Sequence, residues 1–206
     1  MSNAAVLCLA SGSPRRRELL AQIGVPHVAI AADIDESQRA CEAPVHYVRR
    51  MACEKAARLG SQPALRHDLP VLGADTAVVV AGRVLGKPHD PAAAAAMLQQ
   101  LSAGEHQVFS AVALWTEAGC ECLHSETRVR FREISPAEMA RYAAGTEPLD
   151  KAGGYAIQGF AAVFVESLTG SYSGVMGLPL FETAQLLDRR GIGRWQPGSF
   201  VSMLAP

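Results

Sequence analysis

The feature that most constrains the fold is an apolar run in the middle of the chain, residues 69–80, that contains a single acid, Asp75. It is the strongest strand signal in the sequence, and Ala81-Gly82 supplies a tight turn into a second short strand at Val84-Leu85. A carboxylate in such a run must lie at a strand end, pair with a cation or bind a metal, because an isolated buried charge is very costly. Asp75 is therefore either a structural acid that caps the next turn or part of a functional site.

A second stretch, residues 6–23, predicts a strand, a turn of small residues and a helix. Ser13 is a good helix N-cap, and Pro14 suits the first helical position. Arginines follow on the first turn, where the partial positive charge of the helix end disfavours them. An anion such as phosphate at this turn would remove the conflict. The alternative is a capped surface helix with solvated arginines, and the local chemistry leaves both open.

The rest of the chain predicts one α/β unit with a mixed sheet, because helical and strand patterns alternate without a linker. The expected domain covers residues 5–190, and residues 191–206 form a Gly/Pro-rich C-terminal tail. Residues 148–159 carry few structure signals. Further helices are expected at 44–60, 91–101, 136–145 and 180–187, and further strands at 28–30, 108–115, 126–131 and 161–168.

Composition excludes several classes of protein. The 206 residues carry a net charge of −1, so nothing indicates a nucleic-acid binder or a protein of membrane surfaces. No apolar run approaches the length of a membrane span, and no signal peptide is visible. The five cysteines are odd in number and lack the spacing of a metal site. A reducing cytoplasm is the expected location.

Other residues have side chains suited to phosphate chemistry. Lys87 is held in a rigid turn between Gly86 and Pro88, and the predicted hairpin returns it to the end of the sheet that carries Asp75. This is not a Walker A sequence, because no Gly-x-x-x-x-Gly precedes the lysine. A lysine in a loop is usually only solvated, but the flanking residues favour a fixed, phosphate-facing position. The two glycines of residues 150–155 allow a ligand to approach the backbone closely.

Several short motifs occur together in one order and spacing. The motifs are Ser11-Gly12-Ser13-Pro14-Arg15-Arg16, Gly73-Ala74-Asp75-Thr76, Gly86-Lys87-Pro88, Glu147-Pro148-Leu149-Asp150-Lys151-Ala152-Gly153 with Tyr155, Gln158-Gly159 and Gly177-Leu178-Pro179. With this set of motifs the chain resembles the Maf family of nucleoside triphosphate pyrophosphatases, over residues 7–187.

The resemblance implies an elongated mixed β-sheet flanked by helices, with two lobes around a cleft, similar to inosine triphosphate pyrophosphatases. It implies cleavage of a nucleoside triphosphate to the monophosphate and pyrophosphate with a divalent metal cation (Mg2+, Mn2+ or Co2+). Homodimers are common in the family, and neither nucleic acid nor membrane is an expected partner. Arg15, Thr76 and Gln158 are similar to the branch that acts on dTTP and UTP, whereas the branch that prefers 7-methyl-GTP has an aromatic residue in place of Arg15.

The resemblance and the residue chemistry suggest the same roles. Asp75 is the expected general base and, with Glu36, the expected metal ligand. Thr76 and Gln158 are expected to read the pyrimidine. The groups expected to hold and neutralise the phosphates are Ser11, Arg15, Arg16, Lys55 and Lys87. The alternative functions are a nucleotide-sensing regulator of cell division and the 7-methyl-GTP specificity.

Overall fold

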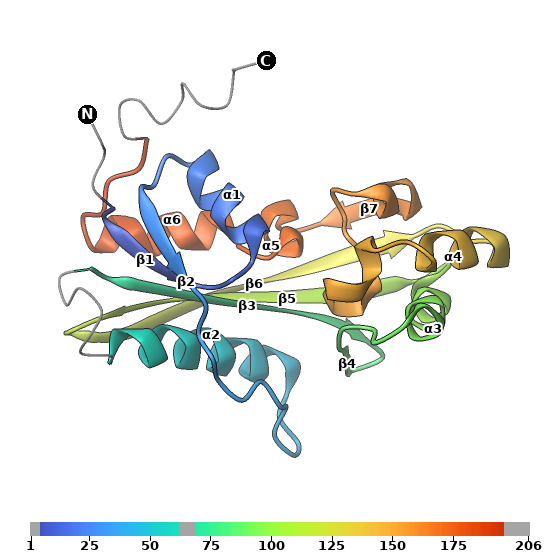
Figure 1. Ribbon diagram of the computed structural model, residues 1–206, viewed down its shortest axis with the longest axis horizontal. Helices are drawn as coiled ribbons and strands as arrows, with labels where there is room; N and C mark the ends of the chain where they lie inside the picture. Colours follow the sequence, from blue (N-terminus) through green and yellow to red (C-terminus); the bar gives the residue numbers. More distant parts are fainter. Residues whose placement is uncertain (1–4, 62–68, 196–206) are drawn as a thin grey trace.

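The computed structural model describes residues 5–61 and 69–195, which form a mixed sheet covered by helices (Figure 1). This architecture confirms the predicted α/β class. Three long antiparallel strands make the centre of the sheet: β3 (Val71–Val80), β5 (Glu105–Thr116) and β6 (Gly119–Phe131). Four shorter strands complete it: β1 (Leu7–Ala10), β2 (His27–Ile30), β4 (Arg83–Leu85) and β7 (Val165–Thr169). Within the described residues the strand order is β2-β1-β3-β5-β6-β7, and β4 pairs with β3.

One edge of β3 has a gap between its two partner strands. On the opposite edge, β3 pairs with β5 from residue 71 to residue 79. On the edge with the gap, β1 pairs in parallel with residues 71–73, and β4 pairs antiparallel with residues 78–80. Residues 74–77 therefore lie between two different partner strands. Asp75 and Thr76 are in this gap, and the alternation of side chains along a strand sends them to opposite faces of the sheet.

Helices cover both faces of the sheet (Figure 1). On one face lies α2 (Pro44–Gly60), which runs along the central strands. The other face carries α1 (Pro14–Gln22), α5 (Tyr172–Met176) and α6 (Leu180–Arg189), and the far end carries α3 (Pro91–Leu101) and α4 (Pro136–Ala143). Three 3₁₀ helices complete that end: η1 (Glu147–Asp150), η2 (Ala152–Gly154) and η3 (Phe160–Phe164). No helix in the described part of the chain has the length and apolar character to cross a membrane.

The helix α2 approaches β3 closely because both present small residues at the contact. A Cβ atom on Gly73 would lie 2.1 Å from the carbonyl oxygen of Ala52 and 2.7 Å from the backbone nitrogen of Ala56. Only glycine fits at that position, two residues before Asp75. This close packing brings Lys55, the helix residue just before Ala56, within reach of the gap.

Two apolar clusters flank the gap and form the cores of two lobes. One cluster joins β1 to α1 and α6 through leucines such as Leu9, Leu20 and Leu187. The other gathers around Phe131 and Tyr155 at the end that carries α3 and α4. The expected two-lobed arrangement of helices about an elongated sheet is therefore present.

Some predicted elements differ from the structure. The strand expected at 161–168 is a 3₁₀ helix up to Phe164, followed by β7, so the earlier half of that prediction is wrong. The short helix α5 was not predicted. Strand β6 begins at Gly119, well before residue 126, because its first half pairs with β5 across the hairpin. Ser13 occupies the N-cap position of α1, but its side chain makes no capping hydrogen bond. Residues 196–206 of the predicted tail lie outside the described residues.

Candidate active site

A cleft of about 840 Å³ opens at the gap in β3. This volume is within the range of small-molecule sites in proteins, roughly 300–1,000 Å³. The elements that line it come from both lobes: the turn before α1, the loop after β2, α2, β3, the β4 turn and the segments around η2 and α5. Of the residues predicted for the site, those that line the cleft are Ser11, Arg15, Arg16, Glu36, Lys55, Asp75, Thr76 and Lys87.

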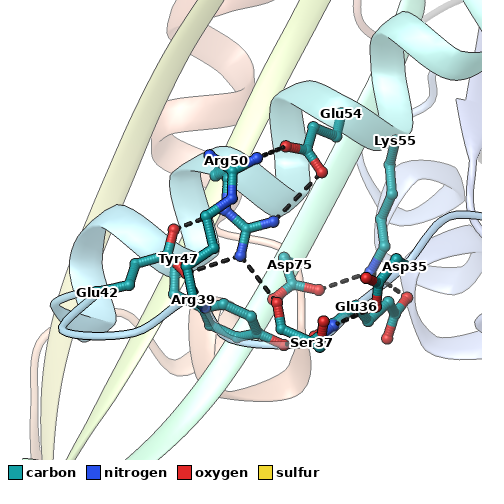
Figure 2. A network of polar contacts seen from close by, with 10 residues as sticks. All are labelled: Asp35, Glu36, Ser37, Arg39, Glu42, Tyr47, Arg50, Glu54, Lys55 and Asp75. Atoms are coloured by element: carbon teal, nitrogen blue, oxygen red, sulfur yellow. Dashed lines mark hydrogen bonds and ion pairs between the residues drawn. The ribbon is translucent and has the colours of Figure 1, made fainter.

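A lysine between two carboxylates forms the floor of the cleft. The Lys55 Nζ atom lies 2.7 Å from Asp75 Oδ1 and 2.7 Å from Glu36 Oε1. Figure 2 shows Lys55 reaching down from α2 to these two acids. The Lys55 and Asp75 side chains are only 8% and 11% exposed, whereas that of Glu36 is 50% exposed. Of the environments that the sequence left open for Asp75, the structure shows a pair with a cation.

The two carboxylates differ in proton affinity. Burial raises the pKa of Asp75 above its ordinary value, although the charges of Lys55 and Arg16 act in the opposite direction. For Glu36, partial burial acts to raise the pKa, but the hydrogen bond from Lys55 and the charges of Lys55, Lys87 and Arg16 outweigh it and lower the pKa. Asp75 is therefore a stronger base than an ordinary aspartate, and Glu36 stays ionised.

The loop that carries Glu36 is held against α2 by polar contacts (Figure 2). The hydroxyl of Tyr47 donates to the carbonyl oxygen of Glu36 at 2.9 Å. Arg50 donates to the carbonyl oxygen of Ser37 at 3.0 Å and to both carboxylate oxygens of Glu42, at 2.6 and 2.7 Å. Tyr47, which also lines the cleft, was missed in the sequence. Its position two turns before Lys55 on the same side of α2 is a spacing that could have found it.

The turn between β1 and α1 presents a hydrogen-bond donor. Ser11 Oγ accepts from the backbone N–H of Ser13 at 3.2 Å and from Arg16 Nη1 at 3.2 Å. Because a hydroxyl oxygen has two lone pairs, its single proton is left for a ligand. Arg16 Nε donates to the carbonyl oxygen of Gly177 at 2.8 Å. Burial lowers the pKa of Arg16, against the charges of Asp75 and Glu36 that raise it. This arginine is therefore not the solvated surface residue of the alternative interpretation.

Thr76 takes part in a chain of hydroxyl groups. Ser110 Oγ, buried in β5, donates to the carbonyl oxygen of Gly174 at 2.6 Å, and Thr76 Oγ1 lies 2.9 Å from the same Ser110 oxygen. The only Ser110 proton is used on Gly174, so Thr76 must be the donor in its contact with Ser110. The Thr76 oxygen then presents only lone pairs to the cleft. Thr76 is an acceptor there, whereas Ser11 is a donor.

Gln158 reaches the cleft through Arg15. With its amide oxygen turned toward that arginine, Gln158 accepts from Arg15 Nε at 2.8 Å and from Arg15 Nη1 at 3.3 Å. Arg15 lines the cleft and Gln158 does not. Two of the three residues that the resemblance associates with base choice are therefore in direct contact, although they lie far apart in the sequence.

Lys87 is positioned by the glycine-rich segment that showed few structure signals. The β3–β4 hairpin returns Lys87 to the cleft, as predicted. The backbone N–H of Gly153 donates to the carbonyl oxygen of Gly86 at 2.9 Å, so η2 holds the lysine's turn in place. Gly153 has a φ of 69°, and a Cβ there would lie 2.8 Å from a Val78 methyl carbon, so both conformation and space require glycine. Lys151, which pairs with Asp150, also lines the cleft.

Glu36 and Asp75 fit a divalent cation that is shared with a ligand. Both acids direct an oxygen at the same ammonium group, so hard oxygen donors already converge on a site of positive charge. Among the described residues no group of three acids, histidines or cysteines is arranged to hold a metal alone. Mg2+ typically binds to one or two carboxylates and completes its coordination with water and substrate phosphates. This pair of carboxylates suits that mode of binding.

A cleft that combines several cations, a helix N-terminus and two acids is typical of proteins that bind phosphate-bearing ligands. Comparison with known sequences agrees with this class. Residues 6–190 match the sequence model of the Maf-like proteins, and the chain belongs to this family. The family predicted from the motifs is thereby confirmed.

Relatives with curated names cover nearly the whole chain. A protein of Saccharophagus degradans is 52% identical over 198 residues, which cover 94% of this chain and 93% of that protein. One from Alcanivorax borkumensis is 52% identical over 192 residues, with 93% and 98% covered. One from Hahella chejuensis is 51% identical over 189 residues, with 92% and 94% covered. All three are named dTTP/UTP pyrophosphatase.

Proposed function

We propose that this protein is a nucleoside triphosphate pyrophosphatase that hydrolyses dTTP and UTP to the monophosphate and pyrophosphate. The observation that carries the proposal is Asp75, a buried carboxylate with a raised pKa among cations in an open cleft. A raised pKa is what a general base needs near neutral pH. The relatives named dTTP/UTP pyrophosphatase, at about half identity over most of their length, support this substrate class.

The phosphate chain is bound by the residues that surround Asp75. Ser11 donates its free proton to a phosphate oxygen, and the first backbone N–H groups of α1 do the same. Arg15, Arg16 and Lys87 supply fixed positive charge. Arg16 is held in place by its bonds to Ser11 and to the Gly177 carbonyl, so little reorganisation is needed when charge develops on the departing pyrophosphate.

Glu36 and Asp75 would hold the divalent cation. When bound, that ion supplies positive charge against the phosphate oxygens and lowers the pKa of a nearby water molecule. Tyr47 and Arg50 fix the loop that carries Glu36, so this carboxylate is in place before the ligand arrives.

The chemical step needs a base beside the attacking water. Water attacks the α-phosphorus, its proton passes to the Asp75 carboxylate, and the bond from the α-phosphorus to the bridging oxygen breaks. The electron pair of that bond leaves with pyrophosphate, whose charge Lys55, Lys87 and the arginines neutralise. Lys55 holds the Asp75 carboxylate in one orientation from 2.7 Å. Burial of Asp75 strengthens it as a base, and the lysine prevents its pKa from rising further.

Pyrimidine choice follows from the direction of the hydrogen bonds. Uracil and thymine present N3–H as a donor between two carbonyl oxygens, whereas cytosine presents N3 as an acceptor. Thr76 offers only lone pairs, so it accepts from N3–H and disfavours cytosine. Gln158 lies outside the cleft lining and accepts from Arg15 through its amide oxygen, so it sets the orientation of the arginine that faces the base. Arg15 and Gln158 act as one unit in this role.

The test is a pyrophosphate-release assay over a panel of dTTP, UTP, CTP, GTP and 7-methyl-GTP, with Mg2+, Mn2+ or Co2+ added in turn. We expect turnover of dTTP and UTP to exceed that of CTP and GTP, and chelation of the metal to abolish it. Tight binding of nucleotide without pyrophosphate release would instead support a nucleotide-sensing protein. A marked preference for 7-methyl-GTP would contradict the assigned substrate class.

A further inference from the structure

Three of the five cysteines meet on the side of the sheet that α2 covers. Cys53 lies on α2, and Cys120 and Cys122 lie two residues apart on β6, so they point to the same face of that strand. All three are free thiols. None lines the cleft, and no role in the proposed reaction falls to them.

The contacts between α2 and β6 place Cys53 beside the other two. Cys122 Sγ lies 4.0 Å from the carbonyl oxygen of Arg49, one helical turn before Cys53. Arg49 Nη1 lies 3.1 Å from His124 Nδ1, the next residue on that face of β6. Farther along α2, Gly60 packs against the ring of Trp115, which pairs with Cys120 across the β-hairpin. Cys53 and Cys122 pack against the same apolar cluster between α2 and the sheet, which places the Cys53 side chain beside the two cysteines of β6.

This arrangement makes the three sulfur atoms unequal. Hydrogen bonds from Cys120 and Cys122, helped by the charge of Arg49, lower the pKa of Cys53 although burial opposes them. The same contacts and burial raise the pKa of Cys120 and of Cys122. Cys53 is therefore the thiol of the three that ionises most readily. Thiolate is the form of cysteine that reacts with oxidants.

The other two cysteines lack these features. Cys8 is buried in β1, and burial raises the pKa of its thiol. Cys41 is exposed in the loop before α2. A metal is not the better occupant of the cluster, because no three ligating side chains among the described residues are arranged to hold an ion.

We propose that Cys53, Cys120 and Cys122 form an oxidation site at which a peroxide joins α2 to β6 by a disulfide. The Cys53 thiolate attacks one oxygen of hydrogen peroxide, the O–O bond breaks, and hydroxide leaves and takes up a proton to become water. Cys53 is then a sulfenic acid. The Cys120 or Cys122 thiol attacks that sulfur, the S–O bond breaks, and a second water leaves with the thiol proton. In total, two thiols are oxidised while one peroxide is reduced to two waters.

The experiment is peroxide treatment of the reduced full-length protein, followed by thiol counting and peptide mapping. We expect a loss of two thiols and a crosslinked peptide pair that joins Cys53 to the segment with Cys120 and Cys122. Cys53→Ser should slow thiol loss by roughly tenfold or more, since the thiolate is the reacting group. Cys41→Ser is the matched control, and its crosslink should form at the wild-type rate.

The double variant Cys120→Ser/Cys122→Ser tests the order of events. Without a resolving thiol, the sulfenic acid on Cys53 should persist and be trapped by dimedone. Wild-type protein in which peroxide leaves Cys53 reduced, or modifies Cys41 first, would overturn the proposal. So would equal rates of thiol loss in Cys53→Ser and Cys41→Ser. The wild-type peptide map decides the matter even if a serine variant folds poorly.

Discussion

Two clusters of buried ionisable side chains lie on the central sheet, and burial acts on them in different ways. In the first, Asp75 and Lys55 form an ion pair at the floor of the open cleft. In the second, His106 of β5 contacts the Tyr155 hydroxyl through Nε2 at 2.8 Å. The ring of Phe131 packs edge-on against both, with centroids 5.0 Å from His106 and 4.9 Å from Tyr155. Tyr155 borders the cleft, whereas His106 lies behind it at 2% exposed.

The difference between the clusters is charge compensation. Burial lowers the pKa of His106 to about 4, and this histidine is neutral at pH 7. Its Nδ1 atom has no hydrogen-bond partner among the described residues. Asp75, by contrast, has Lys55 and Arg16 to favour its charged form. The Asp75 cluster, which has compensating cations, can carry out proton transfer. The neutral, aromatic cluster of His106 and Tyr155 supports the opposite wall of the cleft.

The first way to test this difference is to remove the charge from the reactive cluster. Asp75→Asn should reduce pyrophosphate release by about 10²–10⁴-fold, the usual contribution of a general base. Because burial raises the pKa of Asp75, its ionised form costs stability at pH 7. The variant should therefore unfold at the same temperature as wild type or higher, while Lys55 keeps Glu36 as a partner.

The measurement is pyrophosphate release together with thermal unfolding and nucleotide binding. Near-normal turnover in Asp75→Asn would remove this residue from the mechanism. A large loss of stability would mean that the carboxylate is a structural group, as in the capping role that the sequence left open.

The second prediction separates the two lysines of the cleft. Lys55→Met leaves the buried Asp75 without its nearest cation, and breaking a buried pair in this way costs about 3–5 kcal/mol. Lys87→Met changes an exposed side chain and should alter stability by less than about 0.5 kcal/mol, although it should weaken activity. Urea unfolding of the two variants provides the comparison. Equal stabilities would show that Lys55 is not needed to keep Asp75 charged.

The third prediction concerns the neutral cluster. The folded-state pKa of His106 is about 4 and its unfolded value about 6.5, so the unfolded chain binds more protons between these pH values. The stability that the folded protein gains from a neutral His106 is present above pH 6.5 and is lost as the pH falls toward 4. The full loss is about 3 kcal/mol, of which about 2 kcal/mol is gone by pH 5.

His106→Gln isolates this effect, because glutamine is uncharged and retains a polar group for Tyr155. The free energy of unfolding of the variant should fall less between pH 7 and pH 5 than that of wild type. Parallel pH profiles for the two proteins would show that His106 is protonated in the folded state at little cost.

The sequence predicted much of this architecture because the responsible signals are local. The apolar run around Asp75, the Ala81-Gly82 turn and the Ser135–Glu138 capping box each determine an element from neighbouring residues, and all three elements are present. The 3₁₀ helix at 160–164 escaped prediction because its apolar residues resemble a strand. Its conformation depends on distant Glu147, which accepts from the backbone N–H groups of Phe160 and Ala161.

The residues of the candidate site also divide into those with a local sequence signal and those whose contacts depend on distant segments. Asp75, Lys87 and the first helix turn stand out by their chemistry, since charged residues are unusual beside strands and rigid turns. Only the family resemblance points to Lys55, because its contact with both Glu36 and Asp75 depends on the close approach of α2 at Gly73. The contact between Arg15 and Gln158 and that between Thr76 and Ser110 join distant segments, which residue patterns alone do not reveal.

The smallest predicted effect concerns the hydroxyl chain on the other face of β3. Ser110→Ala removes the group that accepts from Thr76 and donates to Gly174, which should cost about 1–3 kcal/mol because buried partners are left unpaired. Thr76 can then rotate and donate its proton, so the preference for UTP over CTP should narrow. Ser125→Ala is the matched control on the neighbouring strand, since Ser125 pairs with Ser110 in the sheet but its Oγ has no partner among the described residues. Relative rates with UTP and CTP that stay unchanged in Ser110→Ala would show that the direction of the Thr76 hydrogen bond does not determine base choice.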